Sequence, residues 1–260
     1  YGQRTNIQTQ DEAGTLSRDF DAMAASVQNA MENLAEEVRR RDDFVAAFTH
    51  EIKTPMTAML GYADLLRSRD IGQGAREKAA DYVYHETKRL ETLSLKLLEL
   101  MRLGREGPVL ESVPLAAVFS DVRHACAGLE GASVAFADAR GIRVMADRPL
   151  LADLLYNLAV NAVRASKPGS PVHVGFEAQG TGIVLFVQDK GRGIPESELG
   201  RITEPFYMVD KSRARAQNGS GLGLALCQRI AAAHHTALEF ESEVGRGTTV
   251  RLSLQRGTAP

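Results

Sequence analysis

Apolar residues in the first part of the chain recur at alternating spacings of three and four. The seam runs from Met31 through Val38 and Phe48 to Leu66, and a second seam of the same kind covers residues 79–100. This spacing is typical of amphipathic helices that pack as a coiled coil. Because a short segment with two glycines separates the two seams, the pattern predicts a helical hairpin.

Each of these seams is narrow, so two helices alone would bury little apolar surface. Two hairpins from two chains solve the problem by forming a four-helix bundle, and we therefore expect a homodimer. Upstream, an apolar series from Leu16 to Val27 joins the first seam, and the step from Val27 to Met31 is a second consecutive four. Two consecutive fours form a stutter, which changes the local winding of a supercoil.

The pattern changes class after residues 104–114, a stretch with two glycines and two prolines that predicts a linker. Beyond it, short alternating or continuous apolar runs predict strands, and longer periodic segments predict helices. The expected helices cover residues 115–128, 147–166 and 222–235, and the expected strands cover 133–137, 143–146, 171–178, 182–188, 238–243 and 248–254. Residues 115–260 are therefore predicted to form an α/β sandwich.

Charge and cysteine content exclude several classes of protein. The 31 basic and 33 acidic residues leave a net charge of −2, which disfavours a nucleic-acid binder that depends on bulk positive charge. Cys126 and Cys227 are too few for a disulfide framework or a cysteine metal cluster, and a reducing compartment is the natural interpretation. No apolar run approaches the 18 residues or so of a membrane-spanning helix.

One histidine lies on the polar face of the first predicted helix. His50 is two residues from the seam positions Phe48 and Ile52, so its side chain is expected to point away from the seam into solvent. Glu51 is its neighbour, and Thr54 follows one turn later. Since position 54 is not histidine, an H-E-x-x-H zinc site is excluded. The pattern leaves two interpretations open, a solvated polar face or an exposed imidazole nucleophile with a carboxylate beside it.

Glycine turns and paired amides follow one another in the second half. Asn157 and Asn161 lie four residues apart on one predicted helix, and residues 189–193 (DKGRG) end a predicted strand. Residues 219–223 (GSGLG) lead into a helix N-terminus, where free N–H groups favour phosphate, and residues 245–247 form a third turn. Any one of these is most often a plain turn, but four of them in this order, with these elements between them, are less easily explained as plain turns.

At this point the sequence resembles the bacterial sensor histidine kinases of two-component signalling. The resemblance covers essentially the whole chain, and residues 11–23 look like the end of a HAMP transmission module. The motifs that carry it are residues 48–55 (FTHEIKTP), 157–162, 189–195, 204–207, 219–224 and 245–248. The domains implied are a HAMP-like end (1–30), a dimerisation and phosphotransfer hairpin (31–103), the linker (104–114) and a GHKL-type catalytic ATP-binding domain (115–260).

The resemblance implies roles for individual residues. His50 would accept the γ-phosphoryl group of ATP with Glu51 as its base, and Thr54 would orient a water for dephosphorylating the partner. Asn161 would hold Mg²⁺ on the triphosphate with Asn157 beside it, and Asp189 would accept the adenine amino group. The rest of the implied nucleotide site is formed by Arg164, Gly191, Gly193, Phe206, Lys211, Arg213, Arg215, Gly219, Gly221, Leu222 and Gly223.

The implied cofactors are ATP and Mg²⁺, and the implied partners are a second copy of the chain and the receiver domain of a response regulator, with no nucleic acid. The resemblance also implies the cytoplasmic portion of a bacterial inner-membrane protein, attached through segments outside this chain. Lys190, Met208 and Ala165 depart from the usual pattern of the family.

Two other activities stay open from the sequence, a GHKL-type ATP hydrolase and a catalytically silent scaffold that binds nucleotide. The related hydrolases use a glutamate where this chain has Asn157, and an amide is a poor base. The presence of His50, Asn161 and Asp189 argues against the scaffold.

Overall fold

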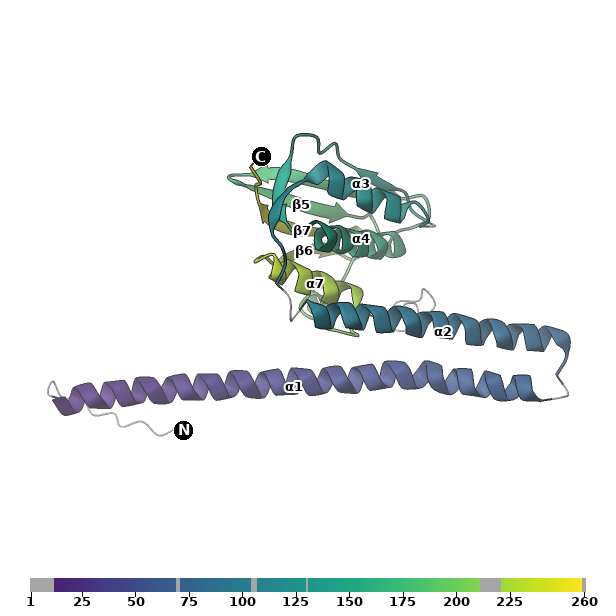
Figure 1. Ribbon diagram of the computed structural model, residues 1–260, viewed down its shortest axis with the longest axis horizontal. Coiled ribbons are helices and arrows are strands. Elements are labelled where there is room, and N and C mark those ends of the chain that lie inside the picture. The colour runs from purple at the N-terminus through teal and green to yellow at the C-terminus, as the bar shows by residue number, and fades with distance from the viewer. Residues whose placement is uncertain (1–11, 69–70, 104–106, 130, 211–220, 259–260) are drawn as a thin grey trace. The chain divides into compact units, whose positions relative to one another are not determined.

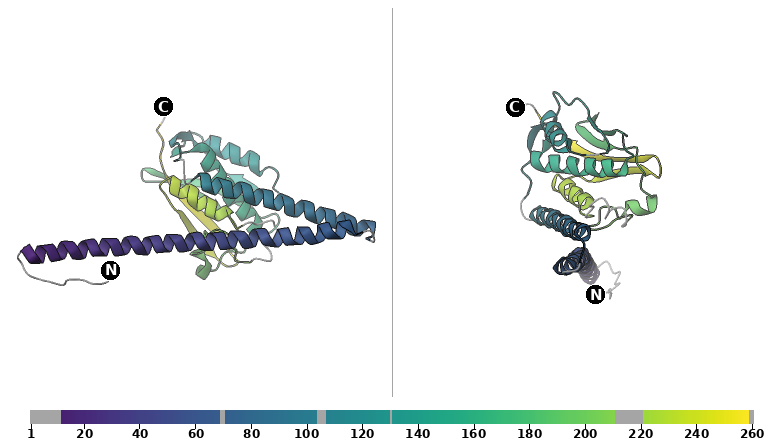
Figure 2. Two further views of the ribbon diagram at one scale, coloured as in Figure 1. Left: turned by 60° about the horizontal axis from the view of Figure 1, so that its bottom comes forward. Right: turned by 90° about the vertical axis from the view of Figure 1, so that its right-hand side faces the viewer.

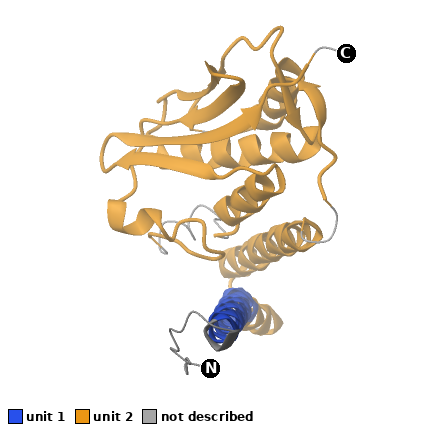
Figure 3. Ribbon diagram, turned by 90° about the vertical axis from the view of Figure 1, so that its left-hand side faces the viewer, with its two compact units in different colours: residues 1–56 blue, residues 57–260 orange. Residues whose placement is uncertain are grey.

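The computed structural model describes residues 12–68, 71–103, 107–129, 131–210 and 221–258. The chain divides into two compact units, residues 1–56 and residues 57–260 (Figure 3).

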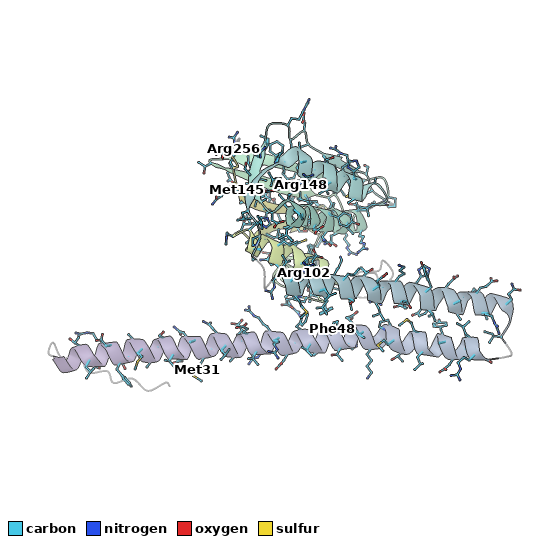
Figure 4. The ribbon with its side chains drawn as sticks, viewed as in Figure 1. Met31, Phe48, Arg102, Met145, Arg148 and Arg256 are labelled. Atoms are coloured by element: carbon cyan, nitrogen blue, oxygen red, sulfur yellow. The ribbon has the colours of Figure 1, made fainter. Side chains whose placement is uncertain are left out.

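The first unit consists of the greater part of helix α1, which covers Glu12–Arg67. The apolar residues of the predicted seam are exposed to solvent on this helix. Met31, labelled in Figure 4, is 50% exposed and Leu34 is 61% exposed. The other exposed apolar residues of the seam in this unit are Leu16, Phe20, Met23, Val27, Val38 and Val45. No helix in the part of the chain that the structure describes is both long and apolar enough to cross a membrane.

The second unit begins with the last turns of α1 and helix α2 (Gln73–Arg102), which form the predicted hairpin. The rings of Tyr62 and Tyr82 stack with their centroids 4.2 Å apart. One turn along, the hydroxyl of Thr87 donates to the sulfur of Met59 at 3.4 Å. The predicted antiparallel pair of helices is therefore confirmed in this unit.

A five-stranded sheet is the framework of the rest of the unit (Figure 1). Its order is β2-β4-β5-β7-β6, and every neighbouring pair is antiparallel except β2 and β4. The strands are β2 (Val134–Phe136), β4 (Val172–Gln179), β5 (Gly182–Gln188), β6 (Leu238–Glu243) and β7 (Gly247–Gln255). A second sheet pairs β1 (Glu111–Pro114) with β3 (Arg143–Ala146).

Three helices pack on the sheet and enclose one hydrophobic core, namely α3 (Leu115–Cys126), α4 (Arg148–Ala165) and α7 (Gly223–Ala233). Phe119, Leu155, Leu185 and Ile230 are among its almost fully buried members. Figure 2 shows α7 lying between α4 and α2, and helix α2 contacts α7. The predicted α/β sandwich is confirmed.

Helix α4 begins as its sequence predicts. Asp147 precedes it and accepts a hydrogen bond from the backbone N–H of Leu150 at 3.2 Å, and Pro149 lies in the first turn. A capping carboxylate satisfies an N–H that has no partner within the helix, and proline lacks the N–H that would otherwise need one. Within this helix, Asn157 and Asn161 lie on one face because they are four residues apart.

Two features differ from the sequence-based expectation. Residues 111–114, which were expected in the linker, form β1, and the short helix α5 (Glu196–Leu199) was not expected. A four-residue edge strand that ends in proline carries no alternation long enough to detect, and it is defined only by its pairing with β3. The linker between the hairpin and the sandwich is correspondingly shorter.

The far end of this linker is fastened to the sandwich. The backbone N–H of Val109 donates to Oδ2 of Asp147 at 3.0 Å, and the backbone N–H of Asp147 donates to Nε2 of His234 at 3.0 Å. The other ring nitrogen of His234 lies 2.8 Å from the carbonyl oxygen of Ile230. Buried His234 is therefore a structural residue that joins α7 to the start of α4.

Candidate functional site

His50 lies on α1 with its side chain 68% exposed, in agreement with the predicted direction. The carboxylate of Glu51 is almost buried, and its Oε1 lies 3.8 Å from Nδ1 of His50. That separation is an ion-pair distance and is too long for a hydrogen bond. The hydroxyl of Thr54 donates to the backbone carbonyl of His50 at 3.2 Å, so the three predicted residues lie within one helical turn.

The amides of Asn157 and Asn161 converge on the N-terminus of α7. A Cβ placed on Gly223, the first residue of that helix, would lie 3.6 Å from Oδ1 of Asn157 and 3.6 Å from Nδ2 of Asn161. The Nδ2 group of Asn157 donates to the carbonyl of Asp153 at 2.9 Å, which fixes the amide so that Oδ1 points toward α7. Backbone N–H groups at a helix N-terminus favour anions. Two amides and a helix N-terminus therefore face one another.

Asp189 follows the last residue of β5 and is buried, with 7% of its surface exposed. Its Oδ1 accepts the backbone N–H of Gly191 at 2.7 Å. Burial raises the pKa of this carboxyl, and the hydrogen bond from Gly191 opposes the rise. A backbone hydrogen bond from Thr248 acts in the same direction, and the lone pairs of the carboxylate oxygens that these bonds do not use can accept a hydrogen bond from a ligand.

The turn that holds Asp189 packs against the turn between β6 and β7. The backbone N–H of Gly245 donates to the carbonyl of Arg192 at 2.7 Å, and that of Ile194 donates to Oγ of Ser242 at 2.8 Å. Gly193 has φ +69°, and a Cβ there would lie 2.1 Å from the carbonyl oxygen of Glu243. Only glycine fits such a position, so this residue holds the two turns together.

Phe206 is joined to the glycine segment before α7. It is buried, has the left-handed φ of 66°, and donates its backbone N–H to the carbonyl of Gly221 at 2.9 Å. A Cβ on Gly221 (φ +67°) would lie 2.7 Å from the backbone of Phe206. Leu222 is fully buried and directly precedes the first residue of α7. The structure brings these three predicted residues together.

The remaining predicted residues make few contacts in the structure or lie outside its described part. Arg164 is exposed in the last turn of α4. Lys211, Arg213, Arg215 and Gly219 lie outside the described residues. Of the departures from the family pattern, Lys190 is exposed, and Ala165 contributes its carbonyl, which accepts the N–H of Arg192 at 3.2 Å and which a Cβ on Gly191 would approach to 2.5 Å.

Two family models match the chain. The His Kinase A (phospho-acceptor) domain matches residues 40–106, and the Histidine kinase-, DNA gyrase B-, and HSP90-like ATPase domain matches residues 146–258. Between them they cover more than half of the chain, in the order hairpin then sandwich. The chain belongs to the sensor histidine kinases.

Curated relatives agree with this assignment to the histidine kinase family. The sensor-like histidine kinase SenX3 of Mycolicibacterium smegmatis is 36% identical over 234 residues, which cover 88% of this chain and 60% of the relative. The sensor histidine kinase YclK of Bacillus subtilis is 29% identical over 252 residues, which cover 94% of this chain and 53% of the relative. The chain thus spans little more than half the length of these relatives.

Solved histidine kinase structures share the fold. Full-length ShkA in complex with AMPPNP matches 82% of this chain and 46% of its own, with a TM-score of 0.57 and 26% identity. The histidine kinase ThkA, solved in complex with the response regulator protein TrrA, matches 87% of this chain and 66% of its own, with a TM-score of 0.67 and 21% identity.

The amides suit Mg²⁺ bound through a nucleotide better than a metal held by protein alone. Among the residues that the structure describes, no group of three or more histidines, cysteines or acidic residues could hold a metal ion. Mg²⁺ commonly takes one or two protein oxygens and completes its shell with phosphates and water. The oxygen of Asn161, beside the N-terminus of α7, is a donor of that kind.

Sequence reasoning missed one residue at the amide pair. Nζ of Lys96, on α2, donates to Oδ1 of Asn157 at 3.1 Å. Burial and, after it, the charge of Arg164 lower the pKa of Lys96. One turn along α2, burial and then the charge of Asp153 raise the pKa of Glu99. Nothing in the local sequence marks Lys96, because its partner is 61 positions away.

Proposed function

We propose that this chain is an ATP-dependent protein-histidine kinase that phosphorylates His50 and passes the phosphoryl group to an aspartate on the receiver domain of a response regulator. The observation that carries the proposal is the exposed imidazole with a carboxylate 3.8 Å from its Nδ1. A polar face alone would not require Glu51 to be buried beside an exposed histidine. Membership of the family and the amide and glycine turns support the same activity.

The position of Glu51 favours one ring nitrogen as the nucleophile. A carboxylate beside Nδ1 stabilises the tautomer with its proton on Nδ1, which leaves the lone pair of Nε2 for the γ-phosphorus. The N–P bond forms as the bond between the γ-phosphorus and the bridging oxygen of ADP breaks, and Glu51 takes the Nδ1 proton. Phosphoryl transfer depends mainly on positioning and charge neutralisation, so no further covalent group is needed.

The sandwich would bind the nucleotide through the residues described above. Asp189 would accept the amino group of adenine, and the turn of Gly191 and Gly193 would let the backbone approach the base. Asn161 would hold Mg²⁺, with Asn157 beside it, and the N-terminus of α7 would face the phosphates. Bound Mg²⁺ would neutralise phosphate charge. Lys211, Arg213 and Arg215 are proposed to do the same from the segment before Gly219.

Incubation of the chain with ATP labelled on its γ-phosphate tests this activity against the alternatives. We expect label on the protein that is labile to acid, stable to base, and lost in His50→Gln. His85→Gln is the matched control on the other hairpin helix and should retain the label. Release of free phosphate without labelled protein would instead indicate an ATP hydrolase, and no turnover would indicate a scaffold. Asn157, as an amide, is a poor base for a hydrolase.

We also propose that the chain dephosphorylates its partner regulator, with Thr54 orienting the attacking water. Thr54 lies one turn from His50 and on the same face, and its hydroxyl is directed by the bond to the His50 carbonyl. That bond uses the hydroxyl proton and leaves the oxygen lone pairs available to a water.

The proposed assembly is a homodimer through the exposed seam of α1. Apolar residues that are 40–71% exposed follow one another along this helix, and a second copy would cover them with a matching seam. Sedimentation analysis should give a dimer, and Leu34→Glu should shift it to a monomer, whereas Glu37→Gln on the same helix should not. A monomeric parent chain would contradict this assembly.

The resemblance further supports a place in the cytoplasmic portion of a bacterial inner-membrane receptor, which membrane fractionation of the full-length protein would check.

A further inference from the structure

The C-terminal part of α2 packs against α4 and α7, the helices that carry the proposed nucleotide site. Leu100 and Leu103 pack against the hydrophobic core of the sandwich, and Figure 2 shows α2 running along α7. At this contact the only polar bond from α2 into the amide pair, among the described residues, is the one from Lys96 to Asn157. This contact of α2 therefore combines an apolar part with one hydrogen bond from a charged group.

The bond of Lys96 uses the acceptor that faces the proposed metal position. The other group of the Asn157 amide is already occupied by the carbonyl of Asp153, so Oδ1 is the single amide oxygen that this side chain presents toward α7. A Cβ placed on Gly223 would lie within van der Waals contact of both this oxygen and the Asn161 amide. An ammonium bound at Asn157 thus stands beside the place where Asn161 would hold a divalent cation.

An ammonium and Mg²⁺ repel one another at such short range, because each carries positive charge and both need the same side of the amide pair. Among the described residues, the hydrogen bond of Lys96 goes to the Asn157 amide. Glu99, one turn along α2, is half-buried, and the charges of both Asp153 and Lys96 act on it. The ammonium nevertheless makes its hydrogen bond to the Asn157 oxygen of the amide pair.

We propose that Lys96 competes with Mg²⁺ at Asn157 and Asn161. The packing of α2 on α4 and α7 and the binding of Mg²⁺-nucleotide therefore exclude one another. This rests on the proposed nucleotide site. A residue of the hairpin would then directly change the affinity of the sandwich for Mg²⁺-nucleotide. The competition also makes the nucleotide the ligand that releases α2.

Calorimetric titration of the whole chain with a non-hydrolysable ATP analogue tests the competition. Lys96→Met keeps the apolar stem and removes the ammonium. Because a hydrogen bond to a charged group must no longer be broken, we expect about tenfold tighter binding in Mg²⁺. In EDTA we expect no gain, since the bare triphosphate does not compete with an ammonium for an amide oxygen. Lys88→Met, at an exposed position paired with Glu91 on the same helix, should match the parent in both buffers.

Hydrogen exchange gives a second measurement that does not depend on affinity. In the parent chain, Mg²⁺ with the analogue should speed amide exchange over residues 93–102, and the analogue in EDTA should not. Circular dichroism checks that each variant is folded. Unchanged or weaker binding by Lys96→Met in Mg²⁺, or an equal gain in EDTA, overturns the competition while the nucleotide site stands. Absence of binding by both parent and variant in both buffers overturns the nucleotide site and the competition together.

Discussion

Gly247 lies directly against the backbone of Asp189: a Cβ on Gly247 would come within 2.1 Å of the Asp189 carbonyl oxygen. Gly247 also has φ +118°, a region that side-chain-bearing residues rarely adopt. The turn that holds Asp189, the proposed acceptor of the adenine amino group, is thus packed against the first residue of β7. A change at Gly247 should act on Asp189 without touching a ligand.

Gly247→Ala is expected to destabilise the sandwich and weaken nucleotide binding together. Backbone strain in the left-handed region costs about 1–3 kcal/mol, and the overlap with Asp189 adds to it. Thermal unfolding followed by circular dichroism measures the loss. Gly200→Ala, where a Cβ meets nothing within 4 Å, is the control and should melt like the parent. Equal melting temperatures for the two variants would contradict the packing argument.

Asp189→Asn should separate binding from stability. The amide oxygen can still accept the N–H of Gly191, and removal of a buried charge whose pKa is raised by burial should leave the melting temperature unchanged or higher. The affinity for ATP should fall by about tenfold or more, because a charged acceptor for the adenine amino group is lost. Asp138→Asn, at an exposed carboxylate bonded to Arg140, should bind ATP normally. Normal ATP affinity in Asp189→Asn would remove this residue from the site.

Thr54→Ala should lower dephosphorylation of the partner regulator by about tenfold or more, since a positioned polar group is lost, while labelling of His50 continues. Thr54→Ser keeps the hydroxyl and should restore most of the activity. The measurement is release of phosphate from a purified phosphorylated receiver domain that accepts the label from this kinase. If Thr54→Ala dephosphorylates it as fast as the parent, the phosphatase role of Thr54 is wrong.

Glu99 makes the stability of the second unit depend on pH. Burial and then Asp153 raise its pKa in the folded chain. A carboxyl with a raised folded-state pKa favours the fold when protonated, so its contribution is complete below the unfolded pKa and is lost as the pH rises through the raised value. Denaturant unfolding should therefore show the parent gaining stability as the pH falls from 7 toward the ordinary carboxyl range of about 4.

Glu99→Gln should lack that part of the pH dependence and should be more stable than the parent at pH 7. Glu91→Gln is the control, because Glu91 is exposed and its pair with Lys88 contributes little. The same pH profile in Glu99→Gln and the parent would show that Glu99 is fully solvated in the folded chain.

Local patterns were enough to predict most of the elements. The strands expected at residues 143–146, 182–188 and 238–243 coincide with β3, β5 and β6, because apolar alternation and glycine turns at their ends are properties of neighbouring residues. The direction of His50 followed from helical periodicity in the same way. The roles assigned to the site residues stay predictions.

What could not be predicted depends on tertiary packing. β1 exists only through its pairing with β3, and the contact of Lys96 with Asn157 depends on where α2 is seated. His234 shows the same limit: the sequence gives no ligand-like spacing, yet its ring joins α7 to the N–H of Asp147. Pairs of residues so far apart in the chain have no periodic signal.

The bond between Val109 and Asp147 shortens the tether between hairpin and sandwich. Helix α2 ends at Arg102, so seven peptide steps separate it from the fastened Val109, and a fully extended chain of that length reaches about 25 Å. A short tether keeps the local concentration of α2 around the nucleotide helices in the millimolar range. Dilution therefore cannot separate α2 from the nucleotide helices. How often they meet is then set by changes within the chain, such as a ligand in the sandwich or a displacement of the helix itself.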